Sequence, residues 1–429
     1  MNAKEIIKKH LEGAGIEING ARPFDIKVHD ERLYRRLLAR GSLGLGEAYM
    51  DGWWECEALD DMIARILRAK LDSRIVGIAP LFTYLLSRLT NQQRRGKAFE
   101  VGEKHYDIGN DLYEAMLDHR MTYTCAYWKD LERVPENLDS AQEAKLDLVC
   151  RKLGLDKRTR SEDGEPLHIL DIGCGWGSFA IYVAEKYGVR VTGVTVSKEQ
   201  VVLAEERAHE AGVADKVEFR LQDYRDVKGE YDHIVSLGMF EHVGHKNYRT
   251  YFDVVRKMLK PEGLFVLQTI GHNHRTSGVD PWITKYIFPN GMIPQSSKTV
   301  RALEGLFVLE DWHNFGPDYN TTLIAWHKNF ERWWCKRGVG LTPSPAVPRT
   351  ELCSGAGARV YAPSPAREEG WGGVGGVGLN PTASYDDRFH RMWRYYLLAC
   401  AGAFRARSIQ LWQIVLSPNG VEGGYETVR

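Results

Sequence analysis

The sequence predicts an α/β fold with an open, mostly parallel sheet, together with a smaller, mainly helical N-terminal domain. Two observations support this prediction. From residue 167 onward, short apolar runs typical of strands alternate with helical stretches. We expect strands over 167–172, 189–196, 217–221, 231–237 and 263–270, and helices over 178–187, 198–211 and 247–259. Residues 1–97 show mainly helical patterning instead.

The N-terminal domain, residues 1–97, contains a segment that is both basic and apolar. Residues 62–97 hold eight Lys or Arg residues and a single acid, Asp72, interleaved with Leu, Ile and Phe. This composition favours an amphipathic element that docks on an anionic membrane surface. The alternative is a helix that packs on the core and leaves a basic face in water.

Residues 98–150 are rich in polar and aromatic side chains without clean periodicity, notably at 105–110 and 123–128. Such a segment is typical of one that lines a site. Parallel sheets bind ligands at the carboxyl ends of their strands, so the polar residues after each expected strand are candidates as well.

A glycine-rich turn follows the first expected strand, with the spacing Asp171-x-Gly173-x-Gly175-x-Gly177. The spacing fits neither the phosphate-binding P-loop nor the dinucleotide fingerprint. It is typical of the S-adenosylmethionine loop of Rossmann-like class I methyltransferases, where glycine lets the backbone approach a ligand closely. The alternative is an ordinary turn between a strand and a helix.

Residues 335–383 differ in composition from the rest of the chain, with ten glycines and six prolines. This composition predicts a disordered insertion, because it provides too little apolar surface to pack. We therefore expect a catalytic domain over 98–334 and 384–429 that is interrupted by the insertion.

Global composition limits the classes of protein and partner. The 57 basic and 57 acidic side chains balance, so nothing favours nucleic acid as a partner. None of the seven cysteines forms a C-x-x-C pair, so we expect neither a metal site nor a disulfide framework. The charged N-terminus predicts no signal peptide, and the longest apolar run, 75–86, is too short to span a bilayer. We expect a cytoplasmic protein, peripherally associated with membranes.

Outside 335–383 the chain resembles the cyclopropane-fatty-acid synthases. The matching segments, in order, are FEVGEKHYDIGN at 99–110, CAYW at 125–128, LDIGCGWG at 170–177, QDYRD at 222–226, GMFEHVG at 238–244, DPWI at 280–283, YIFPNG at 286–291, EDWHNFG at 310–316 and ACAGAFRAR at 399–407.

The resemblance implies a reaction on the cis double bond of an unsaturated phospholipid acyl chain in a bilayer. The alkene takes the methyl group of S-adenosylmethionine, which leaves a carbocation, and a base then removes a proton from the new methyl group so that a cyclopropane ring closes. The site must exclude water, which would trap the cation. Aromatic faces could stabilise the cation; the candidates are Tyr106, Tyr123, Tyr127, Trp128, Phe240, Phe288, Trp312, Phe315 and Tyr319.

The family's base is a bicarbonate ion. The resemblance implies that Cys125, Glu241, the backbone of Ile270 and Tyr319 hold it. This chain has Gln268 where the family usually has His; an amide can donate a hydrogen bond to the anion but cannot relay a proton. Cys400 matches a family cysteine that is sometimes treated as the active residue. We interpret it as a structural thiol, because the reaction needs no thiolate.

The resemblance also implies the contacts of S-adenosylmethionine. These are Tyr123, Thr124, Asp171, Gly173, Cys174, Gly175, Gly177, Thr195, Ser197, Gln200, Gln222 and Asp223. Many class I methyltransferases hold the ribose with an acid after the second strand. This chain has none there, so Gln200 is the expected partner.

Two alternatives remain open. A small-molecule methyltransferase would share the fold, but it would not need the basic, apolar N-terminal segment. The insertion could instead come from an unremoved intron or an error in the deduced sequence, and the chain would then be an inactive relative that binds lipid or cofactor without turnover. The sequence leaves open whether the chain forms a homodimer.

Overall fold

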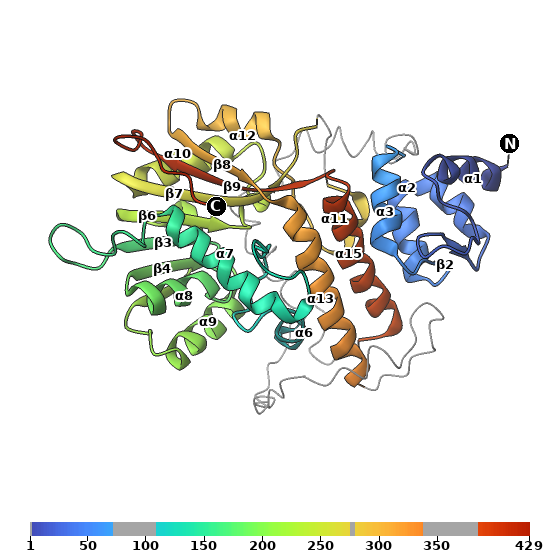
Figure 1. Ribbon diagram of the computed structural model, residues 1–429, viewed down its shortest axis with the longest axis horizontal. Coiled ribbons are helices and arrows are strands. Elements are labelled where there is room, and N and C mark those ends of the chain that lie inside the picture. Colours follow the sequence, from blue (N-terminus) through green and yellow to red (C-terminus); the bar gives the residue numbers. More distant parts are fainter. Residues whose placement is uncertain (1, 72–108, 275–278, 338–384) are drawn as a thin grey trace, which may run out of the picture.

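The computed structural model describes residues 2–71, 109–274, 279–337 and 385–429, and it centres on a seven-stranded sheet (Figure 1). The strand order is β5-β4-β3-β6-β7-β9-β8. Five strands run parallel, as predicted: β3 (His168–Ile172), β4 (Arg190–Thr195), β5 (Val217–Leu221), β6 (Tyr231–Leu237) and β7 (Leu259–Gly271). The α/β class with a mostly parallel sheet is therefore confirmed.

The two strands that extend the sheet beyond β7 were not predicted. β9 (Gln410–Ser417) pairs antiparallel with β7, and β8 (Val308–Asn314) pairs antiparallel with β9. β9 is buried along almost its whole length, so its sequence lacks the alternation that marks a half-buried strand. The C-terminal segment thereby becomes an internal strand of the sheet.

Helices cover both faces of the sheet. On one face, α7 (Leu138–Lys152), α8 (Ser178–Tyr187) and α9 (Lys198–Glu210) enclose a core that includes Val149, Phe179 and Val266. On the other face lie α10 (Tyr248–Met258) and α12 (Ser296–Leu303). Short 3-10 turns, η3 (Tyr224–Asp226) and η4 (Phe240–His242), follow β5 and β6 at the carboxyl edge. This layered arrangement leaves that edge for ligands.

The N-terminal helices pack on the helices beside the sheet. These are α1 (Ala3–Gly13), α2 (Arg32–Met50) and α3 (Leu59–Arg68), with a small ribbon of β1 (Lys27–Val28) and β2 (Trp54–Glu55). They share one hydrophobic cluster with α6 (Asn110–Met116), α11 (Pro281–Tyr286), α13 (Gly316–Lys336) and α15 (Asp387–Arg405). A Cβ added at Gly402 of α15 would lie 2.6 Å from the Asp60 carbonyl oxygen, which shows how closely α3 and α15 approach.

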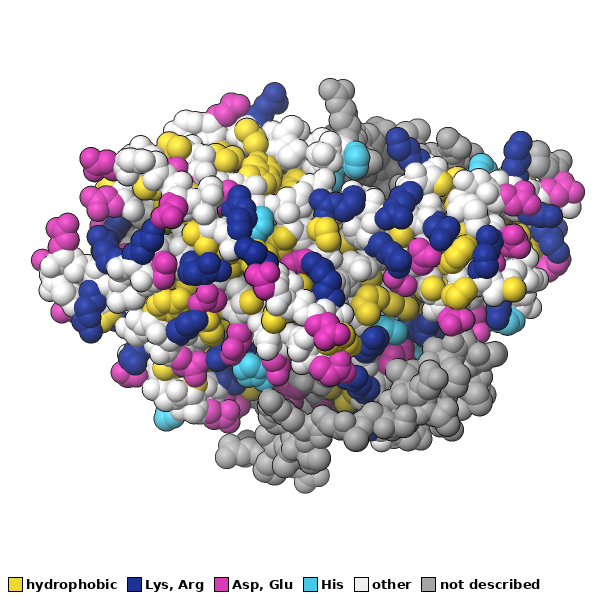
Figure 2. Space-filling model, viewed as in Figure 1, with side chains coloured by type: hydrophobic (Ala, Val, Ile, Leu, Met, Phe, Trp, Pro, Cys, Tyr) yellow, Lys and Arg dark blue, Asp and Glu magenta, His cyan; other side chains and the backbone are white. Residues whose placement is uncertain are grey.

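Several expectations fall on residues outside the described ranges: most of the basic segment 62–97, most of the motif at 99–110, and nearly all of the insertion 335–383. Within the described ranges, every helix is too short or too polar to cross a membrane. On the face shown in Figure 2, Lys and Arg side chains are interspersed with Asp and Glu, in keeping with the balanced net charge.

Candidate active site

The glycine-rich turn after β3 forms the floor of a pocket of about 210 Å³ at the carboxyl edge of the sheet. Gly173 and Gly175 have φ angles of +83° and +55°. A Cβ at Gly173 would lie 2.7 Å from the Met239 Cβ, whereas a Cβ at Gly175 would meet nothing within 4 Å. Gly175 therefore faces open space, and the backbone amides of Gly173 and Cys174 tie the turn to β4 through the Val194 carbonyl.

A buried carboxyl and a buried amine lie together behind this turn. Asp171 is 2% exposed and Lys145, from α7, is 1% exposed. Burial raises the pKa of Asp171 to about 7, and the charge of Lys145 opposes this shift. Burial lowers the pKa of Lys145 to about 8, and the charge of Asp118, followed by Cys125 and Asp171, opposes that shift. Both Asp171 and Lys145 line the pocket and form a polar part of its wall, in which the protonation state of each residue affects that of the other.

α7 also fixes the segment that closes the pocket from above, residues 121–124. The Gln142 amide donates to the carbonyl oxygens of Thr122 and Thr124, at 3.2 and 2.8 Å, and Lys145 Nζ donates to the Thr124 hydroxyl at 3.0 Å. The predicted contacts Tyr123 and Thr124 are thereby held at the pocket wall.

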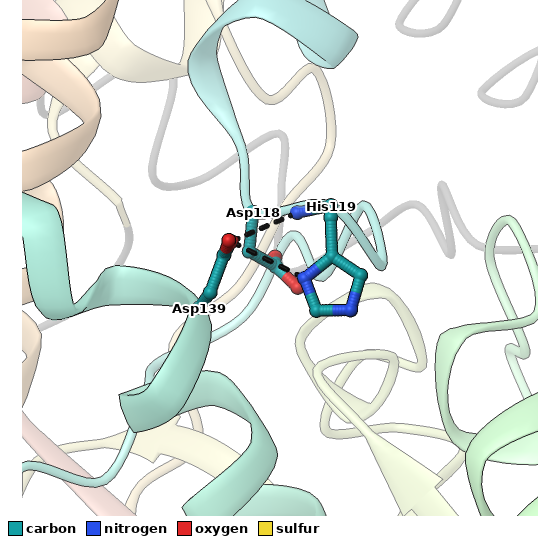
Figure 3. A group of neighbouring side chains, drawn as sticks. All are labelled: Asp118, His119 and Asp139. Atoms are coloured by element: carbon teal, nitrogen blue, oxygen red, sulfur yellow. Dashed lines mark hydrogen bonds and ion pairs between the residues drawn. The ribbon is translucent and has the colours of Figure 1, made fainter. Parts of the chain in front are cut away.

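A group of Asp118, His119 and Asp139 anchors the start of the same segment (Figure 3). Asp118 accepts hydrogen bonds from the backbone N–H of Thr122 at 2.8 Å and that of Arg120 at 3.1 Å. Asp139, at the start of α7, accepts from the His119 backbone N–H at 3.0 Å. Three such side chains could hold a cation, but these hydrogen bonds account for the geometry, and we assign the group a structural role.

The next two strands contribute the other wall of the pocket. The Thr195 hydroxyl donates to Gln200 Oε1 at 2.7 Å and holds that side chain at the wall. Gln222 and Asp223 follow β5, and Asp223 is ion-paired with Arg225 at 2.5 Å. Ser197 lies outside the pocket lining: its hydroxyl caps α9 by accepting from the Gln200 backbone N–H.

A second, larger cavity of about 1650 Å³ opens beside the first. The two share the residues Tyr123, Thr124, Gly238 and His242 in their linings. Away from this shared wall the cavity runs between α15 and the N-terminal helices, where its lining is mostly aliphatic: Ile7, Leu11, Leu33, Leu37, Met62, Ile63, Ile66 and Leu67. Its shape and lining suit a long apolar chain.

Glu241 lines the larger cavity next to His242, which belongs to the wall that the two cavities share. Its Oε1 accepts a hydrogen bond from the Ile270 backbone N–H at 2.6 Å, and both residues line the larger cavity. Burial raises the pKa of Glu241 to about 7, and hydrogen bonds partly oppose this shift. Oε2 is buried without a partner among the described residues; the nearby Thr269 hydroxyl donates to the Ile270 carbonyl instead.

Tyr319 and Cys400 join Glu241 in the lining of the larger cavity. Tyr319 is on the first turn of α13. Burial raises its pKa well above the usual range, and the electrostatic effects of Cys125, Glu241 and Cys400 raise it further. Cys125 is fully buried, and its thiol lies 4.0 Å from the Thr322 hydroxyl. Burial raises the pKa of Cys400 to about 12 and that of Cys125 well above its usual range, so both thiols stay protonated at neutral pH.

Gln268 is completely buried on β7, two residues before Ile270. Alternate residues of a strand point to the same face of the sheet, so the side chains of Gln268 and Ile270 lie on one face. Of the nine aromatic side chains expected near the cation, Tyr123, Phe288 and Tyr319 line the larger cavity. Tyr106 is outside the described residues, and Phe240, for example, stacks on Tyr248 in the core.

Several residues of these walls, above all Lys145, were not predicted from the sequence. A lysine in a helix is normally expected to face solvent, and the sequence pattern around Lys145 does not indicate that it is buried. Met239, His242 and Asn290 also line the smaller pocket, although the motifs that contain them carried the resemblance. Only the tertiary arrangement brings them to the wall.

A doubly covered parallel sheet with a glycine turn after its first strand defines a class I, S-adenosylmethionine-dependent methyltransferase. Residues 93–337 match the sequence family described as mycolic acid cyclopropane synthetase. The chain is 46% identical to the cyclopropane-fatty-acyl-phospholipid synthase of Escherichia coli (strain K12) over 429 residues, which cover 100% of this chain and 96% of that protein. It is 30% identical to a tuberculostearic acid methyltransferase of Mycobacterium tuberculosis, over 91% of this chain and 82% of that protein.

A solved cyclopropane synthase from Mycobacterium tuberculosis superimposes with a TM-score of 0.56 and 26% identity, covering 74% of this chain and 97% of that one. A mycolic acid cyclopropane synthase complexed with SAH and CTAB gives a TM-score of 0.55 at the same identity and the same coverage of both chains. The chain therefore belongs to the cyclopropane synthase family, and the predicted resemblance is confirmed.

Proposed function

We propose that this enzyme converts the cis double bond of an unsaturated phospholipid acyl chain into a cyclopropane ring, with S-adenosylmethionine as the methyl donor and bicarbonate as the base. The observation that carries the proposal is the junction of the two cavities. A small pocket with a glycine turn shares a wall with a long, mostly aliphatic cavity beside Glu241, so a methyl donor and an alkene would meet there.

The smaller pocket fits the cofactor. Bound there, S-adenosylmethionine would supply an electrophilic methyl group on a sulfonium. Gly175 leaves room for close approach along the turn. Gln200 and Gln222, after the second and third strands of the sheet, offer amide groups for the ribose and base. Tyr123 and Thr124 belong to both linings and would separate the cofactor from the alkene.

The residues around Glu241 suit a small oxyanion. The Ile270 backbone N–H already holds one carboxyl oxygen, and Glu241 Oε2 is buried without a partner in the described part of the chain. With its raised pKa, the Glu241 carboxyl could also donate a hydrogen bond to an anion. Tyr319, whose high pKa keeps it protonated, adds a further donor in the lining of the same cavity, whereas the buried Cys125 thiol donates to the Ala126 carbonyl oxygen at 3.1 Å. These groups would hold the base that takes the proton from the new methyl group.

The aliphatic part of the larger cavity would hold the acyl chain away from water, which protects a carbocation from capture. We propose that the N-terminal region serves lipid docking, that the sheet region is the catalytic domain, and that 335–383 is an insertion outside both. Peripheral binding to an anionic bilayer through the basic segment 62–97 belongs to the same proposal.

The experiment compares lipids extracted from cells that express the wild-type chain or the Glu241→Ala variant. Mass analysis of the acyl chains should show a gain of one methylene unit with the wild type and little or none with the variant. Unchanged lipids with a folded wild-type protein would contradict the proposal and favour an inactive relative.

A further inference from the structure

Two buried glutamines face each other on neighbouring strands, and one of them is close in the chain to Ile270 at the end of β7. Gln268 on β7 and Gln413 on β9 are directly opposite in the antiparallel register, and both are completely buried. The Gln413 Nε2 donates to the Gln268 Oε1 at 2.9 Å. This hydrogen bond fixes which end of the Gln268 amide faces its partner.

The same hydrogen bond leaves one polar atom on each side chain. Among the described residues, Gln268 Nε2 and Gln413 Oε1 are both buried without a hydrogen-bond partner. A buried donor without a partner destabilises the fold, so such an arrangement is expected where another group completes it. The free atom of Gln268 is a donor, which requires an acceptor.

The position of Gln268 indicates what that acceptor is. Gln268 shares a face of β7 with Ile270, about 7 Å further along the strand. Ile270 holds Glu241 through its backbone N–H, and Glu241 itself has an unpaired buried oxygen. Glu241 and Ile270 line the larger cavity, where the proposed function places a small oxyanion, and the unpaired Gln268 Nε2 is buried behind that lining.

We propose that Gln413 is a positioning residue that holds the Gln268 amide with its Nε2 donor toward an oxyanion bound beside Glu241. The inference rests on the proposed function, in which that anion is the bicarbonate base. The two ends of an amide are almost the same size, and the carbonyl end would repel an anion. Gln413 supplies the donor that Gln268 Oε1 needs when Nε2 faces the anion.

The test uses the purified full-length enzyme, vesicles of unsaturated phospholipid, and buffer depleted of carbon dioxide to which bicarbonate is added. Gln413→Met removes the donor and keeps an unbranched side chain of similar size. We expect the bicarbonate concentration for half-maximal activity to rise about fivefold, the equivalent of one ordinary hydrogen bond. The affinity for S-adenosylmethionine should stay close to that of the wild type, and the thermal midpoint should fall by a few degrees because Gln268 Oε1 loses its donor.

A second variant gives a signature that a purely structural role would lack. In Gln413→Glu, a protonated carboxyl can still donate to Gln268 Oε1, whereas an ionised one would instead accept from Nε2 and turn the amide around. Its bicarbonate requirement, relative to the wild type at each pH, should therefore increase as pH rises. Gln268→His in the Gln413→Met background should lower the requirement again, because an imidazole can donate to the anion without an orienting partner.

The outcomes separate the two proposals. A wild type that forms cyclopropane and needs bicarbonate, with a Gln413→Met variant that needs no more of it, overturns the role of Gln413 alone. A wild type that forms cyclopropane without bicarbonate overturns the proposed base and this inference together. If Gln413→Met does not fold, the role of Gln413 is decided by how the bicarbonate requirement of Gln413→Glu changes with pH. A bicarbonate requirement equal to that of the wild type at every pH overturns the inference.

Discussion

The Ile270 backbone N–H donates to Glu241 Oε1 at 2.6 Å and joins the end of β7 to the turn after β6. This contact places a buried carboxyl in the lining of the aliphatic cavity, next to the wall that this cavity shares with the smaller pocket. Glu241 is thus held by the backbone at the point where the proposed reaction needs a proton acceptor.

Glu241 should make the stability of the fold depend on pH. Its pKa is raised to about 7 by burial, so ionisation is more costly in the folded than in the unfolded chain. Below about pH 4.5 the Glu241 carboxyl is neutral in both the folded and the unfolded chain. As the pH rises from about 4.5 to 7, the carboxyl ionises in the unfolded chain before it does in the folded one, so the free energy of unfolding falls. Glu241→Gln, which keeps an acceptor for Ile270, should therefore raise the thermal midpoint more at pH 8 than at pH 4.5. A difference that does not change with pH would contradict the raised pKa.

Gly175→Val should weaken S-adenosylmethionine binding at least tenfold, or by about 1.4 kcal/mol or more. Its Cβ would enter the open space of the pocket where the ligand is expected. The matched control is Gly188→Val at the end of α8: Gly188 has a similar φ of +67°, and a Cβ there also meets nothing within 4 Å. Calorimetry should show lost affinity only for Gly175→Val. Equal effects of the two variants would indicate backbone strain rather than a ligand contact.

Lys145→Met should lower cofactor affinity and destabilise the fold, because it leaves Asp171 without its buried counter-charge and frees the Thr124 hydroxyl. Breaking a buried charge pair costs about 3–5 kcal/mol. Adding Asp171→Asn removes the unpaired charge and should restore much of the stability. Denaturant unfolding of both single variants and the double variant measures the coupling, and additive effects would show that the two residues act independently.

Replacing residues 338–384 by a six-residue Gly/Ser linker should keep the fold and raise or preserve activity. The described residues on either side of this segment meet at one carboxylate: Arg337 Nη1 and the Tyr385 hydroxyl lie 2.8 and 3.0 Å from the two oxygens of Asp111. A short linker can therefore close the gap, and shortening a loop changes closure entropy by only about 0.6 kcal/mol per halving of its length.

The thermal midpoint of the shortened chain should equal that of the full chain or exceed it by a few degrees. Asp111→Asn in the shortened chain is the control, since it weakens the joint anchor and should lower the midpoint. A shortened chain that no longer folds would show that 338–384 is a structural element.

The five parallel strands and the glycine turn could be predicted because each is marked by local sequence. The pairing of β9 between β7 and β8 could not, since it depends on a partner about 145 residues away in the chain. The same limit applies to the site. Asp171 and Gly175 follow from spacing, whereas the burial of Lys145 and the Gln268–Gln413 pair arise only when distant elements pack. The roles of Glu241, Tyr319 and Cys125 came from resemblance.

The central claim is that one proton is removed from the transferred methyl group before the ring closes. The most direct measurement incubates the purified enzyme with S-adenosylmethionine carrying a fully deuterated methyl group, bicarbonate, and vesicles of unsaturated phospholipid, followed by mass analysis of the acyl chains. We expect a product that has lost its double bond and retains two of the three deuterium atoms. A product that retains all three, as a chain hydroxylated by water capture of the cation would, contradicts the removal of a proton.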